Sequence, residues 1–142
     1  MTGTLIYTGV KSTQIYLHTD DHLYLKQAEY FEPIIEPESL MRLLPQLELP
    51  VTDLKRNICD SNYRIEDIIP FNELVLFLFT HMKSGYWVSL ACNLLLDEQL
   101  QLLLSPQVIS YLRKSELEGR LPQKELHLVW KLLSKMRRLS AL

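Results

Sequence analysis

The sequence predicts an α+β fold, in which a small N-terminal antiparallel β-hairpin or meander precedes a mainly helical body of antiparallel helices. Residues 14–27 alternate apolar and polar side chains, which is the period of half-buried strands. From residue 37 onward, prolines, capping residues and longer apolar stretches mark helix starts and ends. The length of 142 residues suits one domain. We therefore expect a single domain over 1–142, with the hairpin or meander in 1–27 and helices in 37–142.

The N-terminal strands are predicted from three short segments. TLIYTGV (4–10) is rich in β-branched and aromatic residues, and QIYLH (14–18) and HLYLKQ (22–27) show the alternation. Thr19-Asp20-Asp21 lies between the last two segments as a turn. We expect two or three antiparallel strands, whose tyrosines are available for cross-strand pairs.

Two short helices are expected before residue 62. Pro37 suits the first helical position and Glu38 the first turn, so a helix over SLMRLL begins there and ends near Pro45. Residues 53–56 open another short helix, and residues 59–62 form a turn.

The next helix is predicted to begin at Pro70-Phe71-Asn72-Glu73, with Asn72 as its cap. It would stop around Lys83-Ser84-Gly85, where Gly85 takes the left-handed cap position. Residues 74–79 are apolar on every side, which indicates a central helix. A buried strand is the alternative for 73–83, because short apolar runs fit both.

Three further helices are expected in the C-terminal half. The first covers 86–96 and ends at Asp97-Glu98; the second begins at Ser105-Pro106, runs to about Lys114 and precedes a break at Gly119; the third runs from Pro122 through Leu139. We expect buried side chains at Trp87, Leu90, Ala91, Leu94 and Trp130.

The apolar stretch from Glu73 to Leu96 could be a membrane span, a buried core or a partner surface. Its apolar runs cover 74–82 and 84–96, on either side of Lys83, and each is shorter than the roughly 20 residues that a span needs. We therefore expect core and no membrane insertion. No signal peptide is visible, so Cys59 and Cys92 are expected to be free thiols in the cytoplasm.

No catalytic, cofactor or metal site is expected. His18 and His22 lack a third ligand and are expected at the surface of a hairpin tip. Cys92 could be paired with His81 or His127 as nucleophile and base, but it lies on an apolar helix face. The four glycines are too far apart for a phosphate-binding loop. The basic residues of the last helix suit a helix C-terminus, so nucleic-acid binding is not expected: Lys131, Lys135, Arg137 and Arg138.

The charge is divided along the chain: residues 1–80 carry twelve acids and six bases, and residues 81–142 carry five acids and nine bases. An acidic half with tyrosines between its carboxylates suits a basic protein partner. The alternative is that the two halves complement each other and that the tyrosines pack the hairpin onto the helices. The candidate partner-binding residues are Asp20, Asp21, Tyr30, Glu32, Glu36, Glu38, Asp60, Tyr63, Glu66 and Asp67.

Three phrases, YFEPIIEPESL (30–40), IEDIIPFNELV (65–75) and SGYWVSLACNLL (84–95), together resemble small immunity proteins of bacterial toxin systems, including contact-dependent growth inhibition. They cover about a quarter of the chain. The resemblance implies a cytosolic protein, a monomer or weak dimer when free, that blocks a cognate toxin domain, often a nuclease. It identifies no functional residue. Two alternatives stay open: a dimeric secretion chaperone or adaptor, and an enzyme with a scattered site around Glu66, Asp67 and His81.

Overall fold

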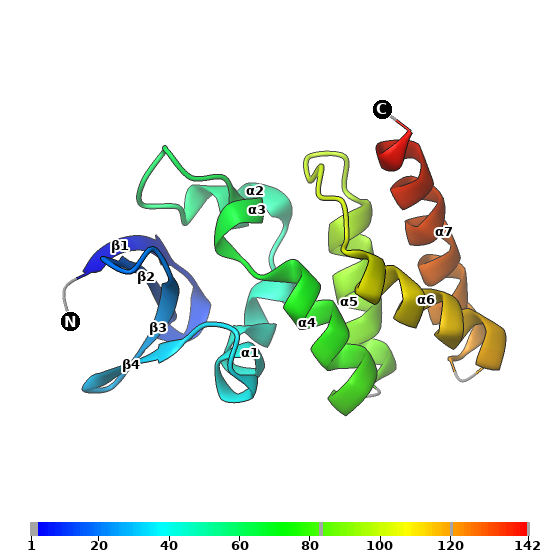
Figure 1. Ribbon diagram of the computed structural model, residues 1–142, viewed down its shortest axis with the longest axis horizontal. Coiled ribbons are helices and arrows are strands. Elements are labelled where there is room, and N and C mark those ends of the chain that lie inside the picture. The colour runs from blue at the N-terminus through cyan, green and yellow to red at the C-terminus, as the bar shows by residue number, and fades with distance from the viewer. Residues whose placement is uncertain (1–2, 83, 120, 142) are drawn as a thin grey trace. The chain divides into compact units, whose positions relative to one another are not determined.

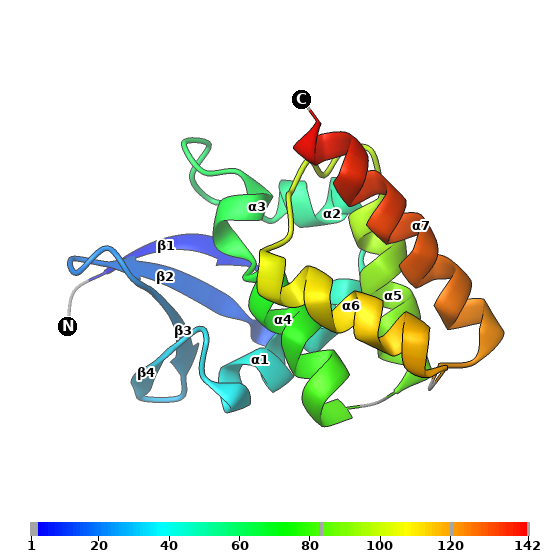
Figure 2. The same cartoon turned by 45° about the vertical axis from the view of Figure 1, so that its right-hand side comes forward.

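The computed structural model describes residues 3–82, 84–119 and 121–141. The chain divides into two compact units, Met1–Pro70 and Phe71–Leu142, and each is described by itself. In the described residues the first unit holds an antiparallel sheet and three short helices, and the second holds four helices (Figures 1 and 2). The predicted α+β class is confirmed. The expectation of a single domain stays a prediction.

The sheet of the first unit is a four-stranded meander in the order β1-β2-β3-β4 (Figure 1). Its strands are β1 (Gly3–Thr8), β2 (Gln14–His18), β3 (Leu23–Gln27) and β4 (Tyr30–Pro33). The first three strands and the turn at 19–21 follow the prediction. The fourth strand was not expected, because Glu and Pro are depleted in strands. Pro33 is tolerated there because it ends an edge strand.

The two edges of this sheet have different surroundings. The backbone N–H of Thr8 donates to the carbonyl of Asn57 at 3.1 Å, and the backbone N–H of Cys59 donates to the carbonyl of Ile6 at 2.8 Å. Residues 57–59 therefore cover the outer edge of β1. At the other edge, Pro33 lies opposite Tyr24, so β4 ends where the β2–β3 turn lies.

Three helices complete the first unit: α1 (Pro37–Leu43), α2 (Val51–Arg56) and α3 (Ile65–Ile68). The helix α1 ends at Leu43, near Pro45 as predicted, and a 3-10 turn, Leu44–Glu48, follows it. The short helix α3 was not predicted. The core of this unit joins sheet residues to helix residues, among them Ile6, Tyr7, Ile15, Leu25, Leu43, Leu54 and Ile65.

The second unit contains α4 (Phe71–Phe77), α5 (Gly85–Leu96), α6 (Pro106–Glu118) and α7 (Gln123–Ser140) (Figure 2). A single π-helical turn, Leu78–Met82, follows α4. The segment 73–82 is thus helical and not a strand, while Lys83 lies outside the described residues. The helix α6 extends to Glu118, beyond the expected end at Lys114. None of the helices in the described ranges is long and apolar enough to cross a membrane.

Two predicted caps are wrong. Asn72 is the second residue of α4 rather than its cap, and its Oδ1 accepts a hydrogen bond from the backbone N–H of Ser105 at 2.7 Å. Gly85 is the first residue of α5 and has no left-handed backbone. The predicted break at Gly119 is confirmed, since its φ of 61° ends α6 in the left-handed region. Ser105 caps α6 as predicted, with Oγ accepting from Val108 N–H at 3.4 Å.

The predicted burial of both tryptophans is wrong. Trp87 and Leu90 are half-buried, whereas Ala91 and Leu94 are buried as predicted, together with Val88 and Cys92. The helix α5 is apolar nearly all round, so its sequence period fits more than one face. Trp130 is 52% exposed. The apolar buried residues of α7 follow the i, i+3, i+4, i+7 pattern, but the pattern starts one residue before Trp130. These residues are Val129, Leu132, Leu133 and Met136.

Lys135 was expected on a basic surface, but it is buried at 1% exposure. Its ammonium donates to three backbone carbonyls: Leu95 at 2.6 Å, Leu100 at 2.7 Å and Asp97 at 3.0 Å. The carbonyl of Leu95 lies in the last turn of α5, where it has no partner within the helix. Burial lowers the pKa of Lys135 below its usual value. Lys135 thus joins α7 to the end of α5.

Candidate functional site

The ten predicted partner-binding residues all lie in the first unit, but they form two groups at different edges of the sheet. Asp20 and Asp21 occupy the β2–β3 turn, near the end of β4. Tyr30, Glu32, Glu36 and Glu38 lie on β4 and on the segment that leads into α1. The remaining residues follow the segment that covers β1. Since β1 and β4 are three strand spacings apart, about 14 Å separates the two edges. The second group comprises Asp60, Tyr63, Glu66 and Asp67.

Two of the three carboxylates at the β1 edge, Asp60 and Asp67, are engaged in local structure. Asp67 Oδ1 lies 3.4 Å from Arg64 Nη2, and Asp67 Oδ2 accepts from the Arg64 backbone N–H at 3.2 Å. The hydrogen bond from Arg64 lowers the pKa of Asp67. Asp60 Oδ1 accepts from the backbone N–H of Asn62 at 3.0 Å. These acids cap a turn and the start of α3, and part of their charge is neutralised locally.

The β2–β3 turn is likewise organised by its own side chains. Asp20 accepts hydrogen bonds from the Tyr24 hydroxyl at 2.6 Å and from the His22 backbone N–H at 2.9 Å. The Tyr24 hydroxyl is the main cause of the lowered pKa of Asp20. His18 is buried and stacks on Tyr24 with ring centroids 4.1 Å apart. The expectation of two surface histidines is therefore wrong for His18, although His22 is exposed.

The described residues contain no cluster of three His, Cys, Asp or Glu side chains that could hold a metal ion. Among these residues, His18 and His22 therefore have no third metal-binding side chain close to both of them. The expectation that the protein binds no metal and no cofactor stays a prediction.

Exposed apolar side chains and carboxylates both occur along β4, the segment that follows it and α1. Tyr30 is 55% exposed, Ile35 58% and Met41 46%. Glu36 and Glu38 are also exposed. Sequence reasoning missed Ile35 and Met41. Ile35 directly follows Ile34, and the sequence gives no signal that Ile34 is buried while Ile35 is exposed. We call this set the β4–α1 surface: Tyr30, Glu32, Ile35, Glu36, Glu38 and Met41.

One hydrogen bond holds the two parts of the β4–α1 surface together. The hydroxyl of Ser39, in α1, donates to Glu32 Oε1 on β4 at 2.6 Å. The strand has only four residues and ends in Pro33, which has no N–H to offer to an added strand. The surface is therefore suited to binding through side chains rather than by extension of the sheet.

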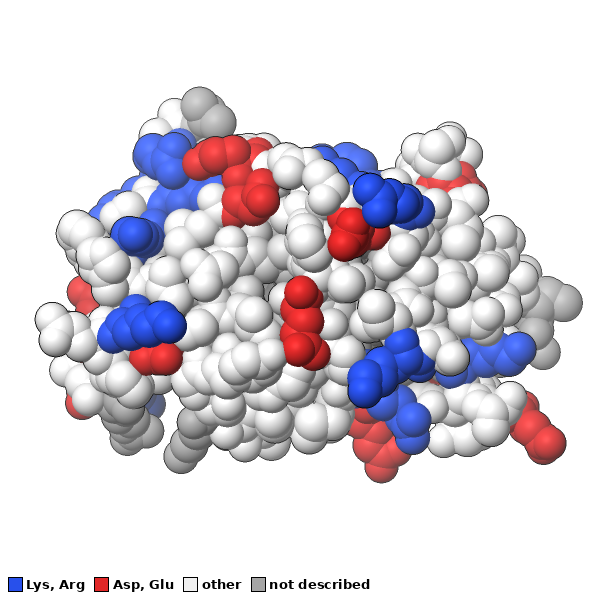
Figure 3. All heavy atoms as spheres, turned by 180° about the vertical axis from the view of Figure 1, so that it is seen from behind, with Lys and Arg blue, Asp and Glu red and all other residues white. Residues whose placement is uncertain are grey.

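Charges of both signs occur together on part of the protein surface. Figure 3 shows Lys and Arg side chains interspersed with Asp and Glu over the face that it draws. The face drawn there is therefore not uniform in the sign of its charge.

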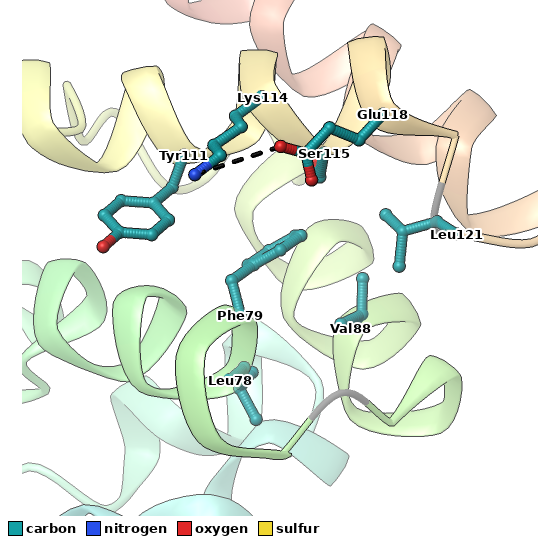
Figure 4. A pocket seen from close by; sticks show the side chains of 8 residues that line it. All are labelled: Leu78, Phe79, Val88, Tyr111, Lys114, Ser115, Glu118 and Leu121. Atoms are coloured by element: carbon teal, nitrogen blue, oxygen red, sulfur yellow. Dashed lines mark ion pairs between the residues drawn. The ribbon is translucent and has the colours of Figure 1, made fainter.

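The second unit contains a small hollow between the π-helical turn, α5 and α6, with a volume of about 140 Å³ (Figure 4). Phe79, Val88 and Leu121 point toward its interior, and Lys114 and Glu118 form an ion pair 3.9 Å apart. The hydroxyl of Ser115 donates to the carbonyl of Leu112 at 2.8 Å. The described lining offers apolar contact and paired charges, but no nucleophile with an adjacent base.

The suggested Cys92 nucleophile is poorly placed for chemistry. Cys92 is 2% exposed, and burial raises the pKa of its thiol to about 12. His81 Nδ1 lies 2.7 Å from Thr80 Oγ1, and His127 stacks with Trp130. A thiol of this kind is a small apolar core group at neutral pH.

No family model, curated protein or solved structure matches this chain.

Proposed function

We propose that this chain is an immunity protein, which binds a cognate bacterial toxin domain through the β4–α1 surface and neutralises it stoichiometrically. The toxin expected from the sequence resemblance is a nuclease. The observation that carries the binding part of this proposal is the joint exposure of Tyr30, Ile35 and Met41 beside carboxylates. The assignment to toxin immunity rests on the resemblance of the three sequence phrases.

The composition of this surface supports a protein partner. Tyrosine and methionine are enriched in interfaces, and an aromatic anchor surrounded by polar groups is a common source of binding energy. Residues 1–70 carry eleven acidic and six basic residues, a net charge of −5. A nuclease is basic where it grips phosphate, so carboxylates around the anchors would speed its association.

A secretion chaperone is the second candidate, and one observation favours it. Leu117 on α6 is 87% exposed and Tyr86 on α5 is 57% exposed, and apolar side chains of this kind could form a dimer interface. A chaperone of this class would be a stable dimer without its cargo. A monomer or weak dimer at micromolar concentration favours the immunity proposal.

The proposal is tested by co-expressing the chain with the product of a neighbouring toxin-like gene. We expect survival of the cells and a 1:1 complex on gel filtration. The double variant Glu36→Lys with Glu38→Lys should weaken the complex. It replaces two carboxylates with ammonium groups, which repel a basic partner. The matched control, Glu73→Lys with Glu116→Lys, makes the same charge change at two positions outside the candidate residues and should have a smaller effect. Death of cells that hold soluble, folded protein, with no complex, would reject the immunity assignment.

A further inference from the structure

The first unit contains a second hollow, which has a basic lining and a volume of about 390 Å³. Three basic residues line it from three different elements: Lys11 from the 3-10 turn Val10–Ser12, Lys26 from β3 and Arg42 from α1. None of the three forms an ion pair with another residue in the described ranges. The described lining contains no carboxylate. Half of the six basic residues of 1–70 therefore line one hollow in an acidic unit.

A buried hydrogen-bond donor lies in the same lining. Gln27 is only 6% exposed, and its Nε2 has no hydrogen-bond partner in the described structure. Buried amide groups are nearly always paired, because an unpaired one loses its bonds to water and gains nothing. An unpaired donor in a lining that also includes three basic residues indicates a place for an anionic acceptor.

The turn that carries Lys11 is held in a disfavoured conformation. Lys11 and Ser12 both have a φ of 59°, in the left-handed region that residues other than glycine rarely adopt. Gln46 fixes this turn: its Nε2 donates to the Val10 carbonyl at 3.2 Å, and its Oε1 accepts from Val10 N–H at 3.3 Å and from the Tyr7 hydroxyl at 2.7 Å. Backbone strain that is held by buried contacts is typical of binding sites.

We propose that this hollow binds the phosphate group of a small phosphorylated molecule, with Gln27 Nε2, Lys11, Lys26 and Arg42 as donors. The site offers a guanidinium and two ammonium groups, which are the usual partners of phosphate oxygens. Its volume lies within the range of small-molecule sites and exceeds the space that a free phosphate ion fills. This inference is independent of the proposed immunity function.

A small molecule fits this site better than a nucleic acid does. Nucleic-acid binding requires an extended basic strip, because much of its affinity comes from many phosphate contacts. Residues 1–70 instead carry a net charge of −5, with eleven acids and six bases, which would repel a long polyanion. A single phosphate group inside a local basic hollow avoids most of that repulsion.

The test is a calorimetric titration of the full chain with glycerol 3-phosphate, inorganic phosphate, acetate and a single-stranded oligonucleotide. We expect saturable binding of glycerol 3-phosphate, weaker binding of inorganic phosphate, and still weaker binding of acetate and the oligonucleotide. Lys26→Gln and Arg42→Gln should each weaken binding of glycerol 3-phosphate about tenfold or more, because each removes a charge-assisted hydrogen bond. Arg56→Gln removes a cation outside the hollow and should leave the affinity within about twofold.

Gln27→Leu gives a sharper test, because it separates binding from stability. Removing an unpaired buried amide should raise the melting temperature by about 2–5 °C, while the affinity for glycerol 3-phosphate falls. Equal losses of affinity for glycerol 3-phosphate in Lys26→Gln and Arg56→Gln would overturn the proposal. The absence of saturable binding of both phosphate compounds would overturn it as well. Tighter binding of the oligonucleotide than of glycerol 3-phosphate would assign the hollow to nucleic acid instead. Acetate binding as tight as phosphate binding would reject phosphate as the ligand.

Discussion

The hydroxyl of Ser39 donates a hydrogen bond to the carboxylate of Glu32 at 2.6 Å, and this bond joins α1 to the edge strand β4. Ser39 is fully buried, whereas Glu32 is partly exposed. The bond therefore fixes one carboxylate of the β4–α1 surface, and Glu32 as a whole stays partly exposed. A surface held in one arrangement loses less conformational freedom when it binds.

Replacement of Ser39 by alanine should lower the free energy of unfolding by about 1–2 kcal/mol, because a buried hydrogen bond to a carboxylate is lost. Urea denaturation followed by circular dichroism measures this change. Ser110→Ala is the matched control, since Ser110 is exposed on α6 and should change the stability by less than about 0.5 kcal/mol. Equal stabilities of the two variants would mean that the Ser39–Glu32 bond contributes little.

Lys135→Met should lower the free energy of unfolding by about 3 kcal/mol. The methionine fills the space of the lysine stem but leaves the carbonyls of Leu95, Asp97 and Leu100 without their donor. The gain from removing a buried charge offsets only part of this loss. Chemical denaturation gives the value.

The control for this variant is Lys131→Met, one turn earlier on α7, where the side chain is exposed. It should be within about 0.5 kcal/mol of the parent protein. A stability of Lys135→Met equal to or above that of Lys131→Met would show that the desolvation of the ammonium outweighs its three hydrogen bonds.

The burial pattern of α7 predicts opposite outcomes for two neighbouring side chains. Leu132 is fully buried, so Leu132→Ala should cost about 2–5 kcal/mol by leaving a cavity. Trp130 is 52% exposed, so Trp130→Ala should cost clearly less in spite of its larger volume. Thermal unfolding of both variants compares them. A larger loss for Trp130→Ala would place the tryptophan in the core, as the sequence first suggested.

The two cysteines should differ strongly in reactivity. The pKa of Cys92 is raised to about 12 by burial, and Cys59 is exposed. At pH 8 a thiol with such a pKa is ionised in only about one molecule in 10⁴, and the thiolate is the species that reacts. Iodoacetamide followed by mass spectrometry should therefore modify Cys59 first and Cys92 only after unfolding. Comparable rates for both thiols in the folded protein would contradict the burial of Cys92.

Local signals in the sequence predicted much of the fold. The alternation in 14–27, the Ser105-Pro106 start and the break at Gly119 depend on neighbouring residues, and all three are confirmed. The predictions were wrong where tertiary contacts decide the role or the burial of a residue. Asn72 receives a hydrogen bond from Ser105 instead of capping its own helix, and Lys135 is buried because three distant carbonyls accept hydrogen bonds from its ammonium.

The candidate sites show the same limit. Sequence reasoning found the acids and Tyr30 in the β4–α1 surface, but it could not separate them from Asp60 and Asp67, because the strand order that places the groups at different edges was unknown. The basic hollow had no signal in the sequence. Lys11, Lys26 and Arg42 are separated along the chain and line one hollow only in the folded unit.

The central claim is that the β4–α1 surface binds a basic toxin domain. The most direct measurement is the affinity of the chain for the product of the neighbouring toxin-like gene, determined for the parent protein and for Tyr30→Ala. We expect a 1:1 complex whose dissociation constant rises by about tenfold or more in Tyr30→Ala, because an exposed aromatic anchor is removed without loss of a core contact. A complex that forms with unchanged affinity in Tyr30→Ala and in Glu36→Lys with Glu38→Lys, or no complex at all, would contradict the account.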